Sequence, residues 1–294
     1  MILAAIDIGS NAARLLVAEA KQYKTEGIDF TKLNLIRIPL QLGIDVFGSG
    51  FIGAKRRMML MQTMKAFQSI MDLYGVEHYR ACATSAMRDA SNAVDITDEI
   101  LRETGIRIEI ISGTEEASIV YETHIAETIN QNDGTFLYVD VGGGSTEVSL
   151  FSERKSLFQE SFNIGTIRLM QHKVLERDWD ALKRFLKNRL KGYENIRLIG
   201  SGGNINKVSS ISKNKEDKPL KYNTLKGMLD ELSACTVEER MHRYHLREDR
   251  AQVIVPALTI YTQIMRWSDA KEVFVPRIGL VDGIVRMLYK VKSK

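Results

Sequence analysis

The sequence is poor in the residues that mark secreted, membrane-spanning and metal-binding proteins. Its two cysteines, Cys82 and Cys235, lie far apart in apolar surroundings, so no disulfide framework is indicated. The only close histidine pair, His242 and His245, lacks the third ligand that a zinc site needs. No apolar run approaches the roughly 20 residues that span a bilayer, and Asp7 interrupts the N-terminal apolar run too early for a signal peptide. We therefore expect a cytoplasmic protein without a membrane segment.

Net charge is also low, with 41 Lys and Arg residues against 37 Asp and Glu residues. A balance of +4 is too small to indicate a nucleic-acid-binding protein, so no nucleic-acid partner is expected. The segment 173–197 is locally basic, with eight basic and four acidic residues around a predicted amphipathic helix at 177–191. This pattern is typical of a solvated helix face, and a track for a polyanion is the alternative.

Two glycine turns between apolar runs are the most informative feature of the sequence. "AAIDIGSNAARLL" near the N-terminus and "YVDVGGGSTEVSL" in the middle align when Asp7 is placed on Asp140 and Gly9 on Gly142, which indicates an internal repeat of a strand-turn-strand unit. Glycine turns present backbone N–H groups to anions such as phosphate. A carboxylate before each turn would repel a bare phosphate, so the pattern predicts a divalent cation beside the phosphate. For a single turn, a purely structural hairpin is the alternative.

The order of predicted elements indicates an α/β fold with a mixed sheet. At 294 residues the chain can hold two domains, since one domain usually takes about 100–200 residues. We expect domains at 1–124 and 125–279, a boundary near 124–134, and a C-terminal helix at about 280–294 that packs back on the first domain. Other local predictions are strands at 2–8, 13–20, 32–43, 79–84 and 106–111, helices at 55–74 and 249–267, a polar loop at 85–92, and a kink at Pro256.

Two α/β halves that each begin with an Asp-Gly hairpin resemble the actin, Hsp70 and sugar-kinase architecture, which implies two actin-like domains with a cleft between them. Within that architecture, the motifs "AAIDIGSNAARLL", "ATSAMRDASNA", "IEIISGTEEAS", "YVDVGGGSTEVSL", "NIGTIRL" and "GSGGN" resemble the exopolyphosphatase and guanosine pentaphosphate phosphohydrolase (Ppx/GppA) family. The resemblance runs from about residue 3 to residue 208. It implies Mg²⁺-dependent hydrolysis of the terminal phosphoanhydride of inorganic polyphosphate or guanosine pentaphosphate.

The resemblance also implies roles for individual residues. Glu116 would be the general base for the attacking water, and Asp140 and Glu147 would hold the cation. The implied phosphate contacts are Ser10, Asn11, the amides of Gly142, Gly143, Gly144 and Ser145, and Arg88. Arg88 is also grouped with Glu116 as catalytic. The repeat adds Asp7 as a second metal candidate, and Arg14 is a weaker phosphate candidate. The chain departs from the family pattern at Ala12, Gln41, Asn204, Gln252, Val281 and Asp282, and the absence of arginine at 41 and 281 removes positive charge near the substrate.

Residue chemistry gives each charged candidate a structural alternative. Ser112 and Glu115 form a predicted capping box, whereas Glu116 lies about 100° further round the helix and is free for catalysis. Arg88 follows a buried strand, where binding residues collect in open α/β sheets, and an ordinary ion pair with Asp89 is the alternative.

Two other functions remain open from the sequence alone. An ATP-dependent kinase or ATPase of the same architecture would need an adenosine pocket around "GSGGN". A non-catalytic sensor would bind polyphosphate or an alarmone without hydrolysing it. A homodimer is compatible with the apolar residues of the second half.

Overall fold

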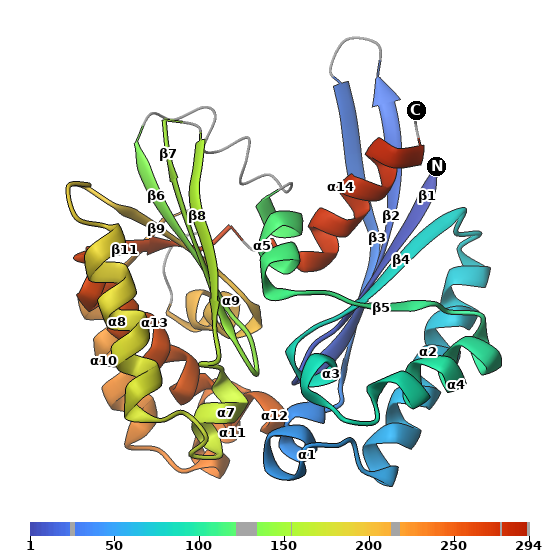
Figure 1. The fold of residues 1–294 in the computed structure, drawn as a ribbon, viewed down its shortest axis with the longest axis horizontal. Coiled ribbons are helices and arrows are strands. Elements are labelled where there is room, and N and C mark those ends of the chain that lie inside the picture. Colours follow the sequence, from blue (N-terminus) through green and yellow to red (C-terminus); the bar gives the residue numbers. More distant parts are fainter. Residues whose placement is uncertain (24–26, 122–133, 154, 213–217, 277, 293–294) are drawn as a thin grey trace. The chain divides into compact units, whose positions relative to one another are not determined.

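The computed structural model describes residues 1–23, 27–121, 134–153, 155–212, 218–276 and 278–292 (Figure 1). The chain forms two compact units, one made of Met1–Thr123 with Gly279–Lys294 and the other of His124–Ile278. Each unit contains one mixed β-sheet with helices, which confirms the predicted α/β class. The predicted boundary near 124–134 falls almost entirely outside the described residues.

The sheet of the first unit has the strand order β3-β2-β1-β4-β5. The first three strands are antiparallel, whereas β4 and β5 run parallel to β1. Their bounds are β1 Ile2–Ile8, β2 Ala12–Tyr23, β3 Gly27–Pro39, β4 His78–Ala83 and β5 Ile108–Ile110. The helices are α1 Leu42–Ser49, α2 Ala54–Leu73, α3 Ser85–Asp89, α4 Ala93–Thr104, α5 Gly113–Tyr121 and α14 Leu280–Lys292.

The C-terminal helix α14 belongs to the first unit although it follows the second in sequence (Figure 1). The Tyr289 ring packs edge-on against Phe30 of β3, with ring centroids 5.7 Å apart. Gly283 permits a close approach to α5, because a Cβ at that position would lie within 2.1 Å of the Ile119 carbonyl oxygen. Helix α14 therefore packs on both the sheet and α5.

The sheet of the second unit has the strand order β10-β11-β9-β6-β7-β8. The strands are β6 Thr135–Val141, β7 Thr146–Ser152, β8 Lys155–Phe162, β9 Arg197–Ser201, β10 Leu220–Lys221 and β11 Glu272–Phe274. The helices are α7 Thr166–Met170, α8 Glu176–Arg189, α9 Gly203–Ile211, α10 Tyr222–Ser233, α11 Val237–Tyr244, α12 Glu248–Ala251 and α13 Ile254–Ser268. A core of aliphatic residues from β6, β7 and β9 packs against α8, α10 and α13, so the apolar face of each helix is buried. No helix of the described residues could cross a membrane, since none is both long and apolar enough.

Three local predictions are corrected by the structure. The strand predicted at 32–43 ends at Pro39, and helix α1 begins at Leu42. The predicted loop at 85–92 contains the short helix α3, which is too short to show helical periodicity in sequence. Pro256 causes no kink within one long helix, because α12 ends at Ala251 and α13 begins at Ile254. Proline is tolerated there since the first turn of a helix has no intrahelical acceptor for its N–H groups.

Candidate active site

The second glycine turn joins β6 to β7, and its carbonyl groups are held by the segment that follows β8. The carbonyl oxygens of residues 142–144 accept hydrogen bonds, in order, from Thr166 N–H (3.0 Å), Ile167 N–H (2.8 Å) and Arg168 Nε (2.7 Å). Gly165 makes this approach possible, because a Cβ on it would lie 2.4 Å from the carbonyl oxygen of Gly143. The turn therefore directs its carbonyls to one side.

The N–H groups of the same turn are available for another partner. Gly142 N–H donates to the Ser145 carbonyl at 2.9 Å and closes the turn. Within the part of the chain that the structure describes, the N–H groups of Gly143, Gly144 and Ser145 donate no hydrogen bond. Nearly all buried N–H groups in native proteins have a partner. Three successive amides of this kind suit a bound anion such as phosphate.

Two carboxylates lie beside this turn on neighbouring strands. Asp140 of β6 is directly opposite Glu147 of β7 in the antiparallel pair. Glu147 is only 1% exposed, and its Oε1 accepts a hydrogen bond from Ser161 Oγ at 2.9 Å. Asp140 Oδ2 accepts from Ser201 Oγ at 3.4 Å. Gly202 has φ +113°, and a Cβ there would lie 3.1 Å from Asp140 Oδ1, so β9 and its turn close around the Asp140 carboxylate.

This pair of carboxylates fits a divalent cation that is shared with a phosphate. Like charges placed directly opposite on two strands destabilise each other, and a cation would relieve that repulsion. Magnesium is usually bound by one or two carboxylates, with phosphate oxygens and water as its other ligands. Among the described residues, no group of three or more His, Cys, Asp or Glu side chains could hold a metal ion. Two carboxylates beside an anion-binding turn are nevertheless a donor set that fits magnesium shared with a phosphate.

Tyr261 of α13 connects the strands that carry these groups. Its buried hydroxyl lies 2.5 Å from the Ser201 carbonyl of β9 and 3.1 Å from the Val139 carbonyl of β6. Burial, followed by the negative charge of Asp140, raises the pKa of Tyr261 well above its ordinary value. The hydroxyl thus stays protonated and donates to the backbone of the two strands.

The first glycine turn, between β1 and β2, is held in a similar way. The Ser10 carbonyl accepts from Gly43 N–H at 2.9 Å, and the Asn11 carbonyl accepts from the N–H groups of Leu40 (3.1 Å) and Gln41 (2.9 Å). The Ser10 hydroxyl is buried and has no hydrogen-bond partner within the described residues. An unpartnered buried hydroxyl costs about 1–3 kcal/mol. A ligand oxygen at this turn would remove that cost.

Asp7 and Arg14, the metal and phosphate candidates of this turn, contact each other. They are directly opposite in the β1–β2 register, and Arg14 Nη1 lies 2.6 Å from Asp7 Oδ2. Burial raises the pKa of Asp7, and this effect outweighs the attraction of Arg14, which lowers it. The pair gives both residues a structural contact, and their proposed ligand roles remain predictions.

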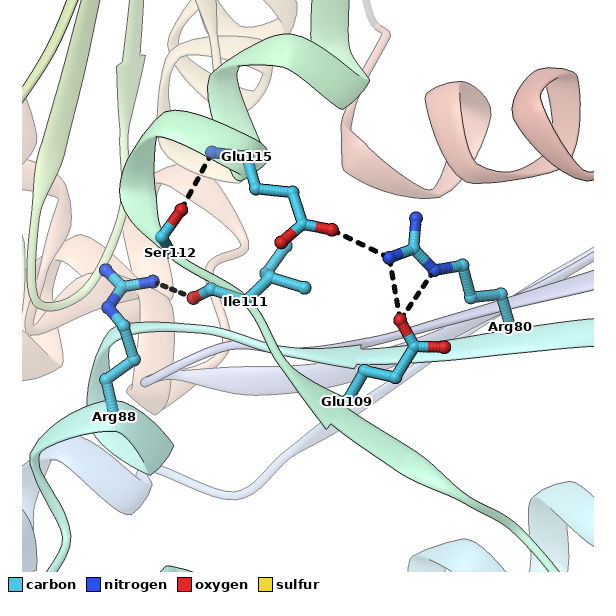
Figure 2. Close-up of polar contacts among 6 residues, drawn as sticks. All are labelled: Arg80, Arg88, Glu109, Ile111, Ser112 and Glu115. Atoms are coloured by element: carbon cyan, nitrogen blue, oxygen red, sulfur yellow. Dashed lines mark hydrogen bonds and ion pairs between the residues drawn. The ribbon is translucent and has the colours of Figure 1, made fainter.

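Arg88 and Glu116 lie close together at the start of α5. Arg88 is on the short helix α3 rather than in a loop, and its Nη1 donates to the Ile111 carbonyl at 2.7 Å (Figure 2). The same atom lies 3.5 Å from Glu116 Oε2, and both side chains are mostly buried. The structure thus pairs the two catalytic candidates of the first unit.

The predicted capping box is only half formed. Glu115 N–H donates to Ser112 Oγ at 3.1 Å, as a cap requires. The Glu115 carboxylate, however, lies 2.8 Å from Arg80 Nη2, and Arg80 also binds Glu109 (Figure 2). A neighbouring strand therefore takes the side chain that the sequence assigned to the helix terminus.

Comparison with known proteins identifies the family. Residues 41–290 match the model of the Ppx/GppA phosphatase family. The chain belongs to this family. It is 30% identical over 258 residues to a bifunctional 3-dehydroquinate synthase/phosphatase of Fusobacterium nucleatum, which covers 81% of this chain and 38% of that protein. It is 30% identical over 169 residues to exopolyphosphatase 1 of Mycobacterium bovis, which covers 58% of this chain and 48% of that protein. The chain thus spans less than half the length of either relative.

A solved structure of the Ppx/GppA family supports the fold assignment. The crystal structure of the Aquifex aeolicus family member is 25% identical to this chain, with a TM-score of 0.77, and the match covers 100% of this chain and 99% of that one. The predicted α/β fold with two actin-like domains is therefore confirmed.

The departures from the Ppx/GppA pattern have structural explanations in the first unit. Val281 is buried, so an apolar residue packs where an arginine was expected. Asp282 accepts from Gly279 N–H at 2.9 Å and lies 2.6 Å from Lys32 Nζ, which holds the start of α14. Gln41 precedes α1 with φ +52°. In the second unit, Gln252 Nε2 donates to Glu248 Oε1 at 3.2 Å. The structure offers no account of Asn204.

Sequence reasoning missed three residues that shape this Ppx/GppA site. Gly165 and Arg168 lie in the motif "NIGTIRL", one of the motifs that resemble the family. No role was assigned to either residue, although this motif was the signal that could have found them. Arg80 had no local signal, because its contacts join β4, β5 and α5.

Proposed function

We propose that this protein is a Mg²⁺-dependent phosphohydrolase that releases the terminal phosphate of inorganic polyphosphate. The observation that carries the proposal is the second glycine turn, whose carbonyls are bound to residues 166–168 while three successive N–H groups have no partner among the described residues. Such a turn binds phosphate, and the paired carboxylates Asp140 and Glu147 beside it fit the cation. The name of the M. bovis relative, exopolyphosphatase 1, supports the same choice of substrate.

The proposed reaction is an in-line attack of water on the terminal phosphorus. Glu116 accepts one proton of the water while the water oxygen forms a bond to phosphorus. The bridging P–O bond breaks at the same time, and its electron pair stays on the oxygen of the shortened chain. General-base assistance of this kind is worth about 10²–10⁴-fold in rate. Arg88, 3.5 Å from Glu116, supplies a cation for the charge that collects on the phosphoryl oxygens.

Phosphate binding in this proposal falls to both turns. In the second unit the amides of Gly143, Gly144 and Ser145 donate to phosphate oxygens, and in the first unit the buried Ser10 hydroxyl and Asn11 are the phosphate contacts. Asp140 and Glu147 would hold the magnesium ion, which would supply positive charge against that of the phosphate chain. Asp7 and Arg14 contribute less, because each already neutralises the other.

A basic surface on α8 favours long polyphosphate over guanosine pentaphosphate. Between Asp180 and Glu194 the chain has no acidic residue, and its five cations in this interval are all exposed: Lys183, Arg184, Lys187, Arg189 and Lys191. None of them forms an ion pair within the described residues. Clustered positive charge of this kind attracts a polyanion. The α8 surface belongs to the same unit as the second turn.

The test is phosphate release from long polyphosphate, short polyphosphate, guanosine pentaphosphate and ATP, each with Mg²⁺ and with excess chelator. We expect turnover of polyphosphate that requires the metal. Turnover that persists in chelator would contradict the role of Asp140 and Glu147. Release from ATP alone would favour the kinase or ATPase alternative, and tight polyphosphate binding without release would favour a sensor. A cytoplasmic location and a homodimer remain predictions from the sequence.

A further inference from the structure

Arg80 joins three segments of the first unit through one guanidinium group. It lies on β4 with its side chain 18% exposed. Nε and Nη2 donate to Glu109 Oε2 on β5 at 3.0 and 2.7 Å, and Nη2 also donates to Glu115 Oε1 on α5 at 2.8 Å (Figure 2). Partly buried, charge-assisted hydrogen bonds of this length are among the stronger polar contacts in proteins.

These contacts bracket the bend where β5 leads into α5. Glu109 precedes the bend at Ile111 and Ser112, and Glu115 follows it, so Arg80 ties its two sides together. On the other side of the bend, Arg88 donates to the Ile111 carbonyl, and Ser112 Oγ accepts from Glu115 N–H (Figure 2). The direction in which α5 begins is therefore fixed by polar contacts from two arginines and one serine.

Helix geometry makes the Glu115 contact important for its neighbour. Successive residues of an α-helix point about 100° apart, so the rotation that places Glu115 on Arg80 also sets the direction of Glu116. With Glu115 on Arg80, the Glu116 carboxylate lies 3.5 Å from Arg88. The described part of helix α5 runs from Gly113 to Tyr121, and Glu116 lies in its first turn. Further along the helix, Ile119 packs against Gly283 of α14, so Arg80 acts on the first turn, which carries Glu116.

We propose that Arg80 and Glu115 form a positioning pair that fixes the rotation of α5 and so holds the Glu116 carboxylate beside Arg88. This inference rests on the proposed role of Glu116 as general base. Arginine suits the position because its planar group donates to Glu109 through Nε and Nη2 while Nη2 also donates to Glu115, whereas a lysine offers one nitrogen on a flexible stem. Loss of the pair would misplace the base without removing any group that contacts substrate.

The experiment compares Glu115→Ala with Glu115→Gln. The alanine variant removes the acceptor for Arg80 but keeps the Arg80–Glu109 contact and the Ser112 cap, whereas glutamine keeps an oxygen that accepts from Arg80. Misplacement of a catalytic group by about 1 Å costs on the order of 10²-fold in rate. We expect Glu115→Ala to lower kcat about 10–100-fold with KM for polyphosphate within about twofold, and Glu115→Gln to restore most of kcat.

Arg57→Ala is the matched control, because Arg57 makes an equivalent pair with Glu99 between α2 and α4 in the same unit, at 2.6 Å. It should leave kcat within about twofold. A Glu115→Ala enzyme with the kcat of Arg57→Ala would overturn the inference, as would a kcat loss of equal size in Glu115→Gln and Glu115→Ala. Arg80→Lys provides a second test of the pair, and it should lower kcat without raising KM.

Amide hydrogen exchange over residues 113–121 separates this inference from the proposed function. Faster exchange is expected in Glu115→Ala than in Glu115→Gln, because the first turn of α5 is then less restrained. If the wild-type protein released no phosphate, the proposed function would fail while the exchange result still showed whether Arg80 restrains α5. Equal exchange in the two variants would overturn the positioning role whatever the enzyme's activity.

Discussion

Gly165→Ala is the substitution for which the structure gives the most direct prediction. Gly165 has φ −136° and ψ 162°, an extended conformation that alanine adopts freely. Backbone strain is therefore not an issue, and any effect must come from the added methyl group. That carbon would lie 2.4 Å from both the Gly143 carbonyl oxygen and the Gly144 carbonyl carbon. Ordinary contacts between such atoms begin about 1 Å further out, so backbone must move.

The displacement should affect both stability and turnover. The contacted atoms are backbone of the turn itself, so a shift of about 1 Å stretches the hydrogen bonds that hold its carbonyls to residues 166–168. Overpacking of this kind typically costs about 1–3 kcal/mol. In a unit of this size that corresponds to a decrease in Tm of roughly 2–10 °C. The same shift moves the N–H groups of the turn, and turnover should fall on the order of 10²-fold.

Gly227→Ala is the matched control within the same unit. Gly227 lies in α10, and a Cβ there meets no atom within 4 Å. Replacing an unhindered helical glycine by alanine stabilises a protein by roughly 0.5–1 kcal/mol. Thermal unfolding monitored by circular dichroism should therefore give a lower Tm for Gly165→Ala and a higher Tm for Gly227→Ala, although the chemical change is the same. If Gly165→Ala matched Gly227→Ala in Tm and in phosphate release, the tight approach at Gly165 would not exist in solution.

Three further outcomes are expected. Glu116→Gln should reduce phosphate release about 10²–10⁴-fold while leaving polyphosphate binding nearly unchanged, since glutamine cannot accept the proton. Glu115→Gln should retain most activity. Equal losses in the two variants would contradict the assignment of Glu116 as the base. Asp7→Asn should raise Tm at pH 7. The pKa of Asp7 in the folded protein is raised above the usual 3.8, so the ionised carboxylate destabilises the fold at neutral pH, and the gain in Tm should vanish as the pH falls toward 3.8. A lower Tm at pH 7 would show that the Arg14 pair dominates. Tyr261→Phe should lower the free energy of unfolding in urea by about 1–2 kcal/mol, because the carbonyls of Val139 on β6 and Ser201 on β9 lose a buried donor. An unchanged free energy of unfolding would contradict the hydrogen bonding of the Tyr261 hydroxyl.

The elements that the sequence predicted well are those with strong local signals. The two glycine turns, the helix at 54–73 and the strand at 78–83 combine regular apolar spacing with clear breakers. Helix α11 shows the same kind of local signal, since Thr236 and Glu239 lie three residues apart and form a capping box with reciprocal hydrogen bonds of 3.2 and 2.8 Å. By contrast, the five residues of α3 are too few for a period to show, and the loop composition of "SAMRDASN" concealed a helical turn.

The site was less predictable wherever a contact depends on tertiary structure. The sequence of Glu115 indicated a helix cap, but Arg80 reaches its carboxylate only because β4 lies beside β5 in the sheet. The Asp7–Arg14 pair was within reach of sequence reasoning, since a short turn centred on Gly9 to Ala12 places residues 7 and 14 opposite each other. Hairpin register alone therefore places these two oppositely charged residues side by side.

The internal repeat extends beyond the two glycine turns. In each unit, a short segment that follows the third strand of the hairpin sheet holds the carbonyls of the turn: residues 40–43 in the first unit and residues 166–168 in the second. What differs is the residue type inside the turn. The first turn carries Ser10 and Asn11, whose side chains can contact a ligand, whereas the second carries Gly143 and Gly144, where only backbone N–H groups can do so. The same backbone arrangement thus supports side-chain contacts in one unit and amide contacts in the other. Removal of the Ser10 hydroxyl and the Gly165→Ala substitution beside the second turn should therefore weaken phosphate binding by separate and additive amounts.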